Sequence, residues 1–189
     1  MGYIKKSELI SEYKSNHGDV RNIEARVFLS SLNLIMEGFK AHTTECFDIF
    51  LSHSYQDARA IVGLKDKLQK VGFTVYVDWI EDQHLDRGKV TEKTAAVLRE
   101  RMKSSKALIY ATSQSAAGSV WMPWELGYMD SCTGLVAVAP ILEDDESFDG
   151  REYLGLYPYL DLTNDSFFIQ KSHTQWVTLT DWLRGMKIK

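Results

Sequence analysis

The sequence predicts an α/β protein built around a parallel β-sheet. From Cys46 onward, short runs of apolar, β-branched and aromatic residues alternate with segments of helical periodicity. The first strand is predicted over residues 47–51 and the second over 73–77, with a helix over 57–71 between them. Two strands joined by one helix form a βαβ unit, in which the strands are parallel and the crossover is right-handed.

The later elements continue this alternation. Each predicted strand is a short apolar run, and each predicted helix places its apolar residues on one face. In chain order the sequence predicts a loop over 78–90, a helix over 91–102, a strand over 106–112, a helix that carries Glu125, a strand over 135–142, a short strand over 159–162 and a closing helix over 174–186. The sheet is therefore expected to contain five strands.

Residues 1–44 differ from the rest because they carry helical periodicity and no convincing strand. They are expected to form an N-terminal helical extension, which leaves 45–189 as the main domain. One apolar stripe consists of Ile4, Leu9, Ile10 and Tyr13, and a second lies between Ile23 and Met36. Such stripes are buried either against the domain itself or against a second copy of the chain.

Composition and charge exclude several functional classes. The net charge of -4 and the interspersed signs provide no basic stripe, so a nucleic-acid partner is not expected. No apolar run approaches the roughly 20 residues that span a bilayer, and a cytoplasmic location is expected. The five histidines are scattered and the two cysteines, Cys46 and Cys132, lack ligand spacing. No metal site is expected, and both cysteines are predicted to be reduced core residues.

The segment from Trp121 to Glu125 is the most informative part of the chain. It follows a predicted strand and a turn-rich loop, and Pro123 is tolerated only in the opening turn of a helix. Ser119 is the expected helix cap, so Glu125 is expected in the first turn, near the positive end of the helix dipole. A carboxylate there tends to stay ionised, which suits stabilisation of a cation or binding of sugar hydroxyls. Glutamate is also common in first turns for structural reasons alone.

Three loops are expected to meet at one edge of the sheet. Open parallel sheets bind ligands beyond the carboxyl ends of their strands, where the strand order reverses. The first loop is Ser52–Gln56, the second begins at Asp78 and Trp79, and the third leads into Glu125. These loops are far apart in sequence but can surround one cleft.

Five ordered blocks of the sequence resemble the TIR domain in order and spacing. The blocks are Phe47–Ser54, Val77–Asp78, Leu85–Gly88, Lys106–Thr112 and Ser119–Leu126. The resemblance covers roughly residues 45–186, and Met122 stands where the family often has cysteine. It implies a flavodoxin-like fold, with a five-stranded parallel sheet and helices on both faces.

The resemblance also implies an activity, since many bacterial and plant TIR domains cleave NAD+ between nicotinamide and ribose. Glu125 matches the catalytic glutamate of the family, and Trp121 matches the aromatic residue four positions before it. Nicotinamide leaves as a neutral pyridine, so one carboxylate that stabilises an oxocarbenium-like state is sufficient. Capture of the sugar by water gives ADP-ribose, capture by an internal atom gives a cyclic ADP-ribose-type signal, and capture by another molecule gives a base-exchanged conjugate.

NAD+ is expected to be a substrate and not a cofactor, because neither a dinucleotide fingerprint nor a P-loop occurs in the sequence. Ser52 is expected either to bind a ribose or phosphate oxygen or to cap the helix near Asp57. Trp79 would stack on a base or serve as a structural residue, and Arg87 would bind the pyrophosphate or remain solvated. The full set of expected substrate-binding residues is Phe50, Ser52, Tyr55, Trp79, Arg87 and Trp121.

Three functions are compatible with these motifs. The first is an NAD+ glycohydrolase or ADP-ribosyl cyclase in bacterial anti-phage immunity, similar to the TIR components of Thoeris-type systems. Such an enzyme would self-associate through TIR contacts and would signal to an effector that binds its nucleotide product. The second is a non-catalytic TIR adaptor that assembles through the loop containing Leu85–Gly88. The third is a nucleoside deoxyribosyltransferase, which also combines a flavodoxin-like sheet with a catalytic glutamate.

Overall fold

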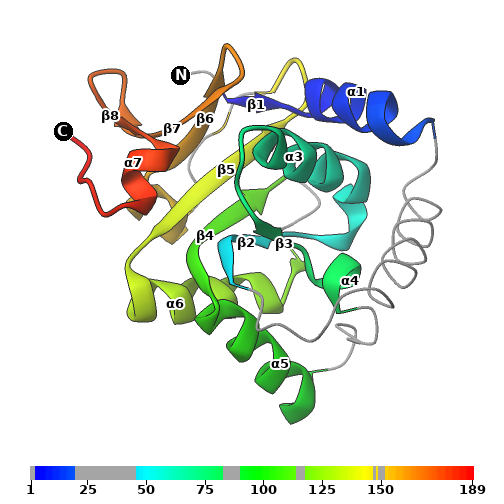
Figure 1. The fold of residues 1–189 in the computed structure, drawn as a ribbon, viewed down its shortest axis with the longest axis vertical. Coiled ribbons are helices and arrows are strands. Elements are labelled where there is room, and N and C mark those ends of the chain that lie inside the picture. The colour runs from blue at the N-terminus through cyan, green and yellow to red at the C-terminus, as the bar shows by residue number, and fades with distance from the viewer. Residues whose placement is uncertain (1–2, 20–45, 83–89, 114–117, 147, 149–151) are drawn as a thin grey trace.

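The computed structural model describes residues 3–19, 46–82, 90–113, 118–146, 148 and 152–189 (Figure 1). These residues form one eight-stranded sheet with helices on both faces. The strands are β1 (Ile4–Lys5), β2 (Phe47–Ser52), β3 (Val75–Tyr76), β4 (Ser105–Thr112), β5 (Val136–Leu142), β6 (Tyr159–Thr163), β7 (Ser166–Ser172) and β8 (Gln175–Thr178). The helices are α1 (Lys6–His17), α3 (Ala58–Lys70), α4 (Asp78–Glu81), α5 (Glu92–Lys103), α6 (Trp121–Thr133) and α7 (Leu179–Leu183), together with the 3-10 helices η1 (Tyr55–Asp57) and η3 (Glu152–Leu156).

The central part of the sheet is parallel, as the sequence predicts. Strands β3, β2, β4, β5 and β6 lie side by side in that order, and every neighbouring pair is parallel. The order reverses between β2 and β4, because the chain moves outward from β2 to β3 and then returns to the other side of β2. The carboxyl ends of β2 and β4 therefore border the place where open α/β sheets bind ligands.

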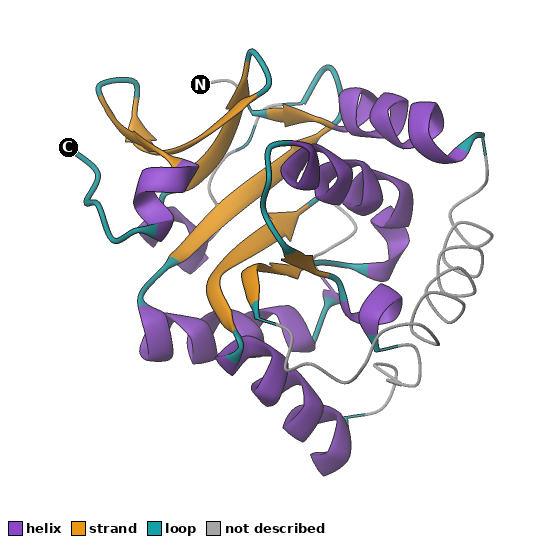
Figure 2. Ribbon diagram, viewed as in Figure 1, coloured by secondary structure: helices purple, strands orange, loops and turns teal. Residues whose placement is uncertain are grey.

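Helices lie on both faces of the sheet (Figure 2), and the buried side chains form two hydrophobic cores. One core contains Ile49 of β2 together with buried residues of α1, α3 and α7. The other contains Phe50 of β2 together with buried residues of α5 and α6. Neighbouring residues of β2 point to opposite faces, as the two-residue period of a strand requires. The amphipathic helix expected over 57–71 is also confirmed, since Ala60, Ile61, Leu64 and Leu68 are among the buried residues of α3.

The first segment of the chain is packed into the same core as the rest. Strand β1, which the helical periodicity did not predict, pairs in parallel with β5 and aligns Ile4 with Ile141. Helix α1 lies on α3, and Leu9 and Tyr13 are fully buried. The approach is close at Gly63, where an added Cβ would lie 2.0 Å from the Leu9 carbonyl oxygen. The first predicted stripe is therefore buried against the domain, and the second, between Ile23 and Met36, lies outside the described residues.

The prediction of a closing helix over residues 174–186 is wrong for the first half of that range. That half contains β8, the last strand of an antiparallel meander formed by β6, β7 and β8. Only the residues of α7 are helical. Asn164 and Asp165 have positive φ angles of 50° and 55°, which produce the two-residue turn between β6 and β7. Trp176, expected on the inner helical face, lies on β8 and is 50% exposed. The apolar spacing that indicated a helix belongs instead to a strand followed by a short helix.

A smaller difference concerns the segment after β3. The sequence predicts a loop there, but α4 occupies its beginning, and Trp79 and Ile80 of this helix are buried. Residues 83–89 lie outside the described part of the chain. The two cysteines are free as expected, but Cys46 and Cys132 are exposed and do not lie in the core.

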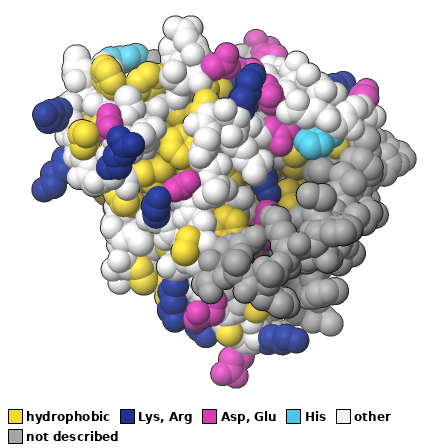
Figure 3. Space-filling model, viewed as in Figure 1, with side chains coloured by type: hydrophobic (Ala, Val, Ile, Leu, Met, Phe, Trp, Pro, Cys, Tyr) yellow, Lys and Arg dark blue, Asp and Glu magenta, His cyan; other side chains and the backbone are white. Residues whose placement is uncertain are grey.

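The surface carries charges of both signs. On the face shown in Figure 3, Lys and Arg side chains are interspersed with Asp and Glu side chains. Among the described residues, no helix has the length and apolar composition needed to cross a membrane. The same part of the chain contains no group of three or more His, Cys, Asp or Glu residues placed to hold a metal ion.

Candidate active site

Helix α6 positions Glu125. The helix begins at Trp121, and the Ser119 hydroxyl accepts a hydrogen bond from the Met122 N–H at 3.3 Å, so Ser119 caps this end as predicted. Glu125 is the fifth residue of the helix and lies at the start of its second turn, not in the first turn as the sequence suggested. The difference arises because the helix starts two residues before Pro123. Glu125 remains close to the positive end of the helix.

Ser52 holds the carboxylate of Glu125. The Ser52 hydroxyl donates a hydrogen bond of 2.5 Å to Glu125 Oε2, and both residues are 0% exposed. Ser52 is the last residue of β2, so the contact lies where the strand order reverses. Ser54, not Ser52, caps η1, the 3-10 helix that directly precedes α3, because the Ser54 hydroxyl accepts from the Gln56 N–H at 3.5 Å. The loop after β2 and the helix after β4 thus meet as expected.

A buried histidine connects the loop after β2 with the helix after β3. The indole Nε1 of Trp79 donates to His53 Nε2 at 2.7 Å, and His53 Nδ1 lies 2.8 Å from the Leu51 carbonyl oxygen. Nε2 can accept only when it carries no proton, so these two contacts define a neutral ring with its proton on Nδ1. Asp78 Oδ1 also lies 3.3 Å from Nε2, but this pair is not ionic while the ring is neutral. Trp79 is 5% exposed, and its hydrogen bond to His53 joins α4 to the loop after β2.

The other residues predicted to bind substrate occupy different surroundings. Phe50 is 1% exposed and stacks on Tyr76 in the core, with ring centroids 5.0 Å apart. Trp121 is buried at the start of α6 and packs edge-to-face with Trp124 at 5.5 Å. Tyr55 begins η1, and its side chain lies outside the described atoms. Arg87 lies outside the described residues, as does the predicted adaptor loop Leu85–Gly88.

Two tyrosines beside Glu125 were not predicted from the sequence. Tyr110 of β4 is the Cα partner of Ser52 and is 6% exposed. Burial, together with the nearby Tyr153 of η3 and Glu125, raises the pKa of Tyr110. The alternation of β4 indicates which face Tyr110 occupies, but no local signal places Tyr153 beside it.

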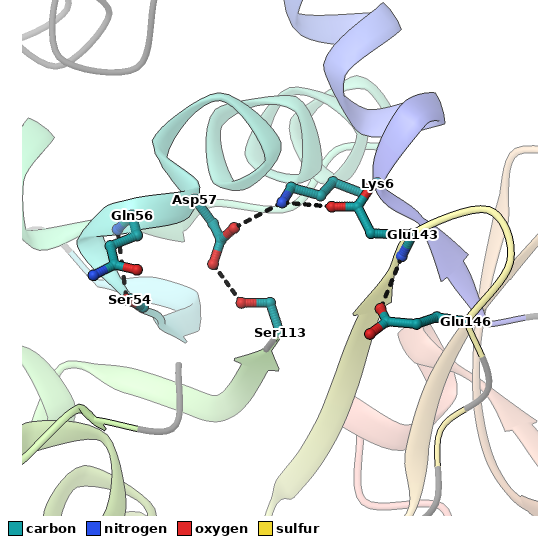
Figure 4. A network of polar contacts seen from close by, with 7 residues as sticks. All are labelled: Lys6, Ser54, Gln56, Asp57, Ser113, Glu143 and Glu146. Carbon is teal, nitrogen blue, oxygen red and sulfur yellow. Dashed lines mark hydrogen bonds and ion pairs between the residues drawn. The ribbon is translucent and has the colours of Figure 1, made fainter. Parts of the chain in front are cut away.

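A second polar cluster lies at the same edge of the sheet (Figure 4). Lys6 Nζ lies 3.3 Å from Asp57 Oδ1 and 2.8 Å from Glu143 Oε1, and the Ser113 hydroxyl donates to Asp57 Oδ2. Burial lowers the pKa of Lys6, but its contacts with Glu143 and Asp57 outweigh this and raise the pKa above the ordinary value. The cluster connects α1 to the segments that follow β2, β4 and β5.

The arrangement around Glu125 suits stabilisation of positive charge. A carboxylate inside a protein interacts more strongly with a developing cation than it does in water. The hydrogen bond from Ser52 fixes the position of one oxygen of this carboxylate. Glu125 is 0% exposed, so its carboxylate has no contact with solvent in this structure.

Comparison with protein-family models assigns the family. The model described as "TIR domain" matches residues 49–179, which include Ser52, Tyr110 and Glu125. The chain belongs to the TIR domain family. The resemblance predicted from the five sequence blocks is therefore confirmed. The matched part of the TIR domain extends from β2 to the first residue of α7.

Two relatives are similar to this TIR domain. A protein of Bacillus cereus (strain MSX-D12) named "Probable 3' cyclic ADP-D-ribose synthase ThsB'" is 46% identical over 161 residues, which cover 80% of this chain and 83% of that protein. A protein of Cytobacillus dafuensis named "Putative cyclic ADP-D-ribose synthase TIR2" is 31% identical over 104 residues, which cover 53% of this chain and 27% of that protein. The first match extends over most of both chains.

Proposed function

We propose that this TIR domain breaks the nicotinamide–ribose bond of NAD+ and converts the ADP-ribosyl part into a cyclic ADP-ribose-type signal for anti-phage defence. The contact between Ser52 and Glu125 at the strand-order reversal carries the proposal. The relative that is 46% identical is named as a probable 3' cyclic ADP-D-ribose synthase, which supports the cyclic product. NAD+ is consumed in this reaction and serves as the substrate.

The proposed reaction begins with loss of nicotinamide. The bond between the ribose anomeric carbon and the pyridine nitrogen breaks, and its electron pair leaves with neutral nicotinamide. The Glu125 carboxylate, held by Ser52, stabilises the oxocarbenium-like sugar that remains. A nucleophilic atom elsewhere in the ADP-ribosyl group then bonds to the anomeric carbon, one proton is lost to solvent, and the cyclic product forms. If water bonds instead, it loses one proton to solvent and the product is ADP-ribose.

Two further proposals concern partners. Self-association through TIR contacts and an effector that binds the nucleotide product are part of the proposed signalling function. Neither the adaptor function nor the deoxyribosyltransferase function gains support from a described contact. The buried Ser52–Glu125 pair suits a chemical role better than it suits an adaptor, whose binding surface must be exposed.

The experiment that tests the function measures nicotinamide release from NAD+ and resolves the products by mass. Wild-type protein is assayed over a range of concentrations that includes assembled protein, and in extracts of phage-infected cells. We expect nicotinamide and a cyclic product from the wild type, and at least about a 100-fold slower release from Glu125→Gln. Glu100→Gln is the matched control, because Glu100 is an exposed glutamate on α5. Release that Glu125→Gln leaves unchanged would refute the proposal.

A further inference from the structure

Ser52 lies at the point where β2 leaves the sheet. Its hydroxyl contacts Glu125 at 2.5 Å, so the direction of this side chain matters for the carboxylate. Within β2 the pairing with neighbouring strands restrains the backbone, and Ser52 is the last residue of β2 that is aligned with β4. The direction of the Ser52 side chain therefore depends on what restrains the backbone directly after the strand.

The side chain of His53 supplies a restraint at this point. His53 is 3% exposed, and its Nδ1 donates to the Leu51 carbonyl oxygen at 2.8 Å. This hydrogen bond closes a ring of atoms that includes N, Cα and C of Ser52. Both soft backbone dihedral angles of Ser52 belong to that ring, so neither can change far unless the hydrogen bond breaks.

Trp79 of α4 holds the imidazole of His53 in the orientation that this ring requires. An indole N–H can only donate, and Nε1 of Trp79 donates to His53 Nε2 at 2.7 Å. The two aromatic rings also pack edge-to-face, with centroids 6.3 Å apart. Because Nε2 accepts, the proton of the neutral imidazole is on Nδ1, the atom that faces the Leu51 carbonyl. Trp79 therefore sets both the position and the tautomer of His53.

We propose that Trp79 and His53 are positioning residues for the Ser52 hydroxyl. They hold it in the direction that reaches the Glu125 carboxylate. Their effect on NAD+ cleavage rests on the proposed function of Glu125. Because they act through Ser52 and not on the substrate, loosening them should lower kcat and leave the KM for NAD+ almost unchanged.

The first test compares Trp79→Phe with Trp182→Phe. Phenylalanine keeps an aromatic ring but has no indole N–H to donate to His53. Trp182 is the matched control, because it is also 5% exposed but lies on α7, which packs on β7 and β8. We expect Trp79→Phe to lower kcat roughly 2- to 10-fold, as the loss of one neutral hydrogen bond allows. The KM of Trp79→Phe, and both constants of Trp182→Phe, should stay within about 2-fold of the wild type.

A second pair of variants changes the histidine itself. The amide of asparagine can still donate to the Leu51 carbonyl oxygen, whereas leucine cannot. We expect His53→Leu to lower kcat at least as much as Trp79→Phe does, and His53→Asn to recover part of that loss. Equal losses in His53→Leu and His53→Asn would contradict the restraint through Leu51.

A double-mutant cycle tests whether Trp79 acts through Ser52. Once Ser52→Ala has removed the hydroxyl, Trp79→Phe should lower kcat by less than about 2-fold. Equal fold losses in the wild-type and Ser52→Ala backgrounds would overturn the positioning role while NAD+ cleavage stood. An unchanged kcat in Trp79→Phe would overturn it as well.

A measurement without substrate separates this inference from the proposed function. The carbon-13 NMR resonance of the Glu125 side-chain carboxyl group, assigned with Glu125→Gln, reports the hydrogen bond from Ser52. We expect Trp79→Phe to move this resonance in the same direction as Ser52→Ala does, and Trp182→Phe to leave it in place. That result in a protein that never cleaves NAD+ would support the positioning role and refute the enzymatic proposal. A resonance that Trp79→Phe leaves in place would overturn the positioning role.

Discussion

Ser52 and Glu125 are 73 residues apart in the sequence, yet the hydroxyl of one lies 2.5 Å from the carboxylate of the other in the interior of the protein. Hydrogen bonds to charged groups are stronger than neutral ones, and they strengthen further away from water. The pair therefore fixes α6 relative to the end of β2. Any movement of the loop after β2 is transmitted to the carboxylate.

Substitution of Ser52 tests the importance of this pair. We expect Ser52→Ala to lower kcat for NAD+ cleavage roughly 10- to 100-fold, because a hydrogen bond to a charged group contributes about 1.5–3 kcal/mol. Ser54→Ala is the matched control, since Ser54 lies in the loop after β2 and its hydroxyl accepts a hydrogen bond of 3.5 Å from the Gln56 N–H. Steady-state kinetics of nicotinamide release provide the measurement. Equal losses in the two variants would show that the Glu125 contact has no special role.

Gly63 tests the close packing of α1 on α3. An alanine Cβ at this position would lie 2.0 Å from the backbone of Leu9, so the helices would have to separate. We expect Gly63→Ala to lower the free energy of unfolding by roughly 1–3 kcal/mol or more. Gly127→Ala on α6 should instead raise it by about 0.5–1 kcal/mol, because nothing lies within 4 Å and alanine favours a helix. Urea denaturation of the two variants measures both changes, and a neutral Gly63→Ala would contradict the described packing.

Asp48 provides a prediction about acid stability. Burial alone would raise the pKa of Asp48, but hydrogen bonds from Lys106 and Thr74 outweigh it and hold the pKa below the ordinary 3.8. Because the pKa of Asp48 is lower in the folded state, its carboxylate stabilises the folded state above pH 3.8. This stabilisation is lost as the pH falls through the folded-state pKa of Asp48. We expect Asp48→Asn to reduce the free energy of unfolding by about 1–2 kcal/mol at pH 7. The difference should shrink toward pH 2 in urea titrations, and a constant difference would refute the assignment.

Lys6 tests the cluster at the edge of the sheet. Lys6→Met leaves the carboxylate of Asp57, whose side chain is 4% exposed, without its ammonium partner. Because Lys6 is itself partly exposed, we expect a loss of about 1–3 kcal/mol in the free energy of unfolding, less than for a fully buried pair. Lys5→Met is the control, since Lys5 contacts only backbone carbonyl oxygens at the exposed surface, and its loss should stay below about 1 kcal/mol.

The pH dependence of the Lys6 effect follows from its raised pKa. The stabilisation of the folded state by the Lys6 ammonium is fully present below pH 10.5. It is lost as the pH rises through the higher pKa that Lys6 has in the folded state. The difference between wild type and Lys6→Met should therefore stay constant across neutral pH. A difference that disappears between pH 6 and 8 would assign the effect to another group.

The parallel sheet and the place of Glu125 near the start of a helix could be predicted because the sequence patterns that indicate them each lie within a few residues. The apolar run of β2, the periodicity of α3 and the proline near the start of α6 each restrict the backbone over a few residues. The C-terminal meander was missed because a short strand that ends in a helix can imitate helical spacing around Trp176. The Asn164–Asp165 turn was the signal that could have identified the hairpin.

The neighbours of Glu125 were harder to predict because they depend on tertiary contacts. The pairing of Ser52 with Tyr110 follows from strand register, which one sequence does not determine. Trp79 was expected either to stack on a base or to be a structural residue, and its hydrogen bond to His53 depends on a tertiary contact that the sequence does not show, because an indole N–H in the interior needs an acceptor. Strand β1 has two residues and is defined only by the β5 edge that it joins.

The pairing of β1 with β5 also has a consequence for biosynthesis. Ile141 is synthesised 137 residues after its partner Ile4. Contacts of such long sequence separation form late and slow the folding of a chain. Helix α1 can pack on α3 before β5 is made, but β1 lacks its strand partner until β5 emerges, so β1 is among the last strands to take its place in the sheet.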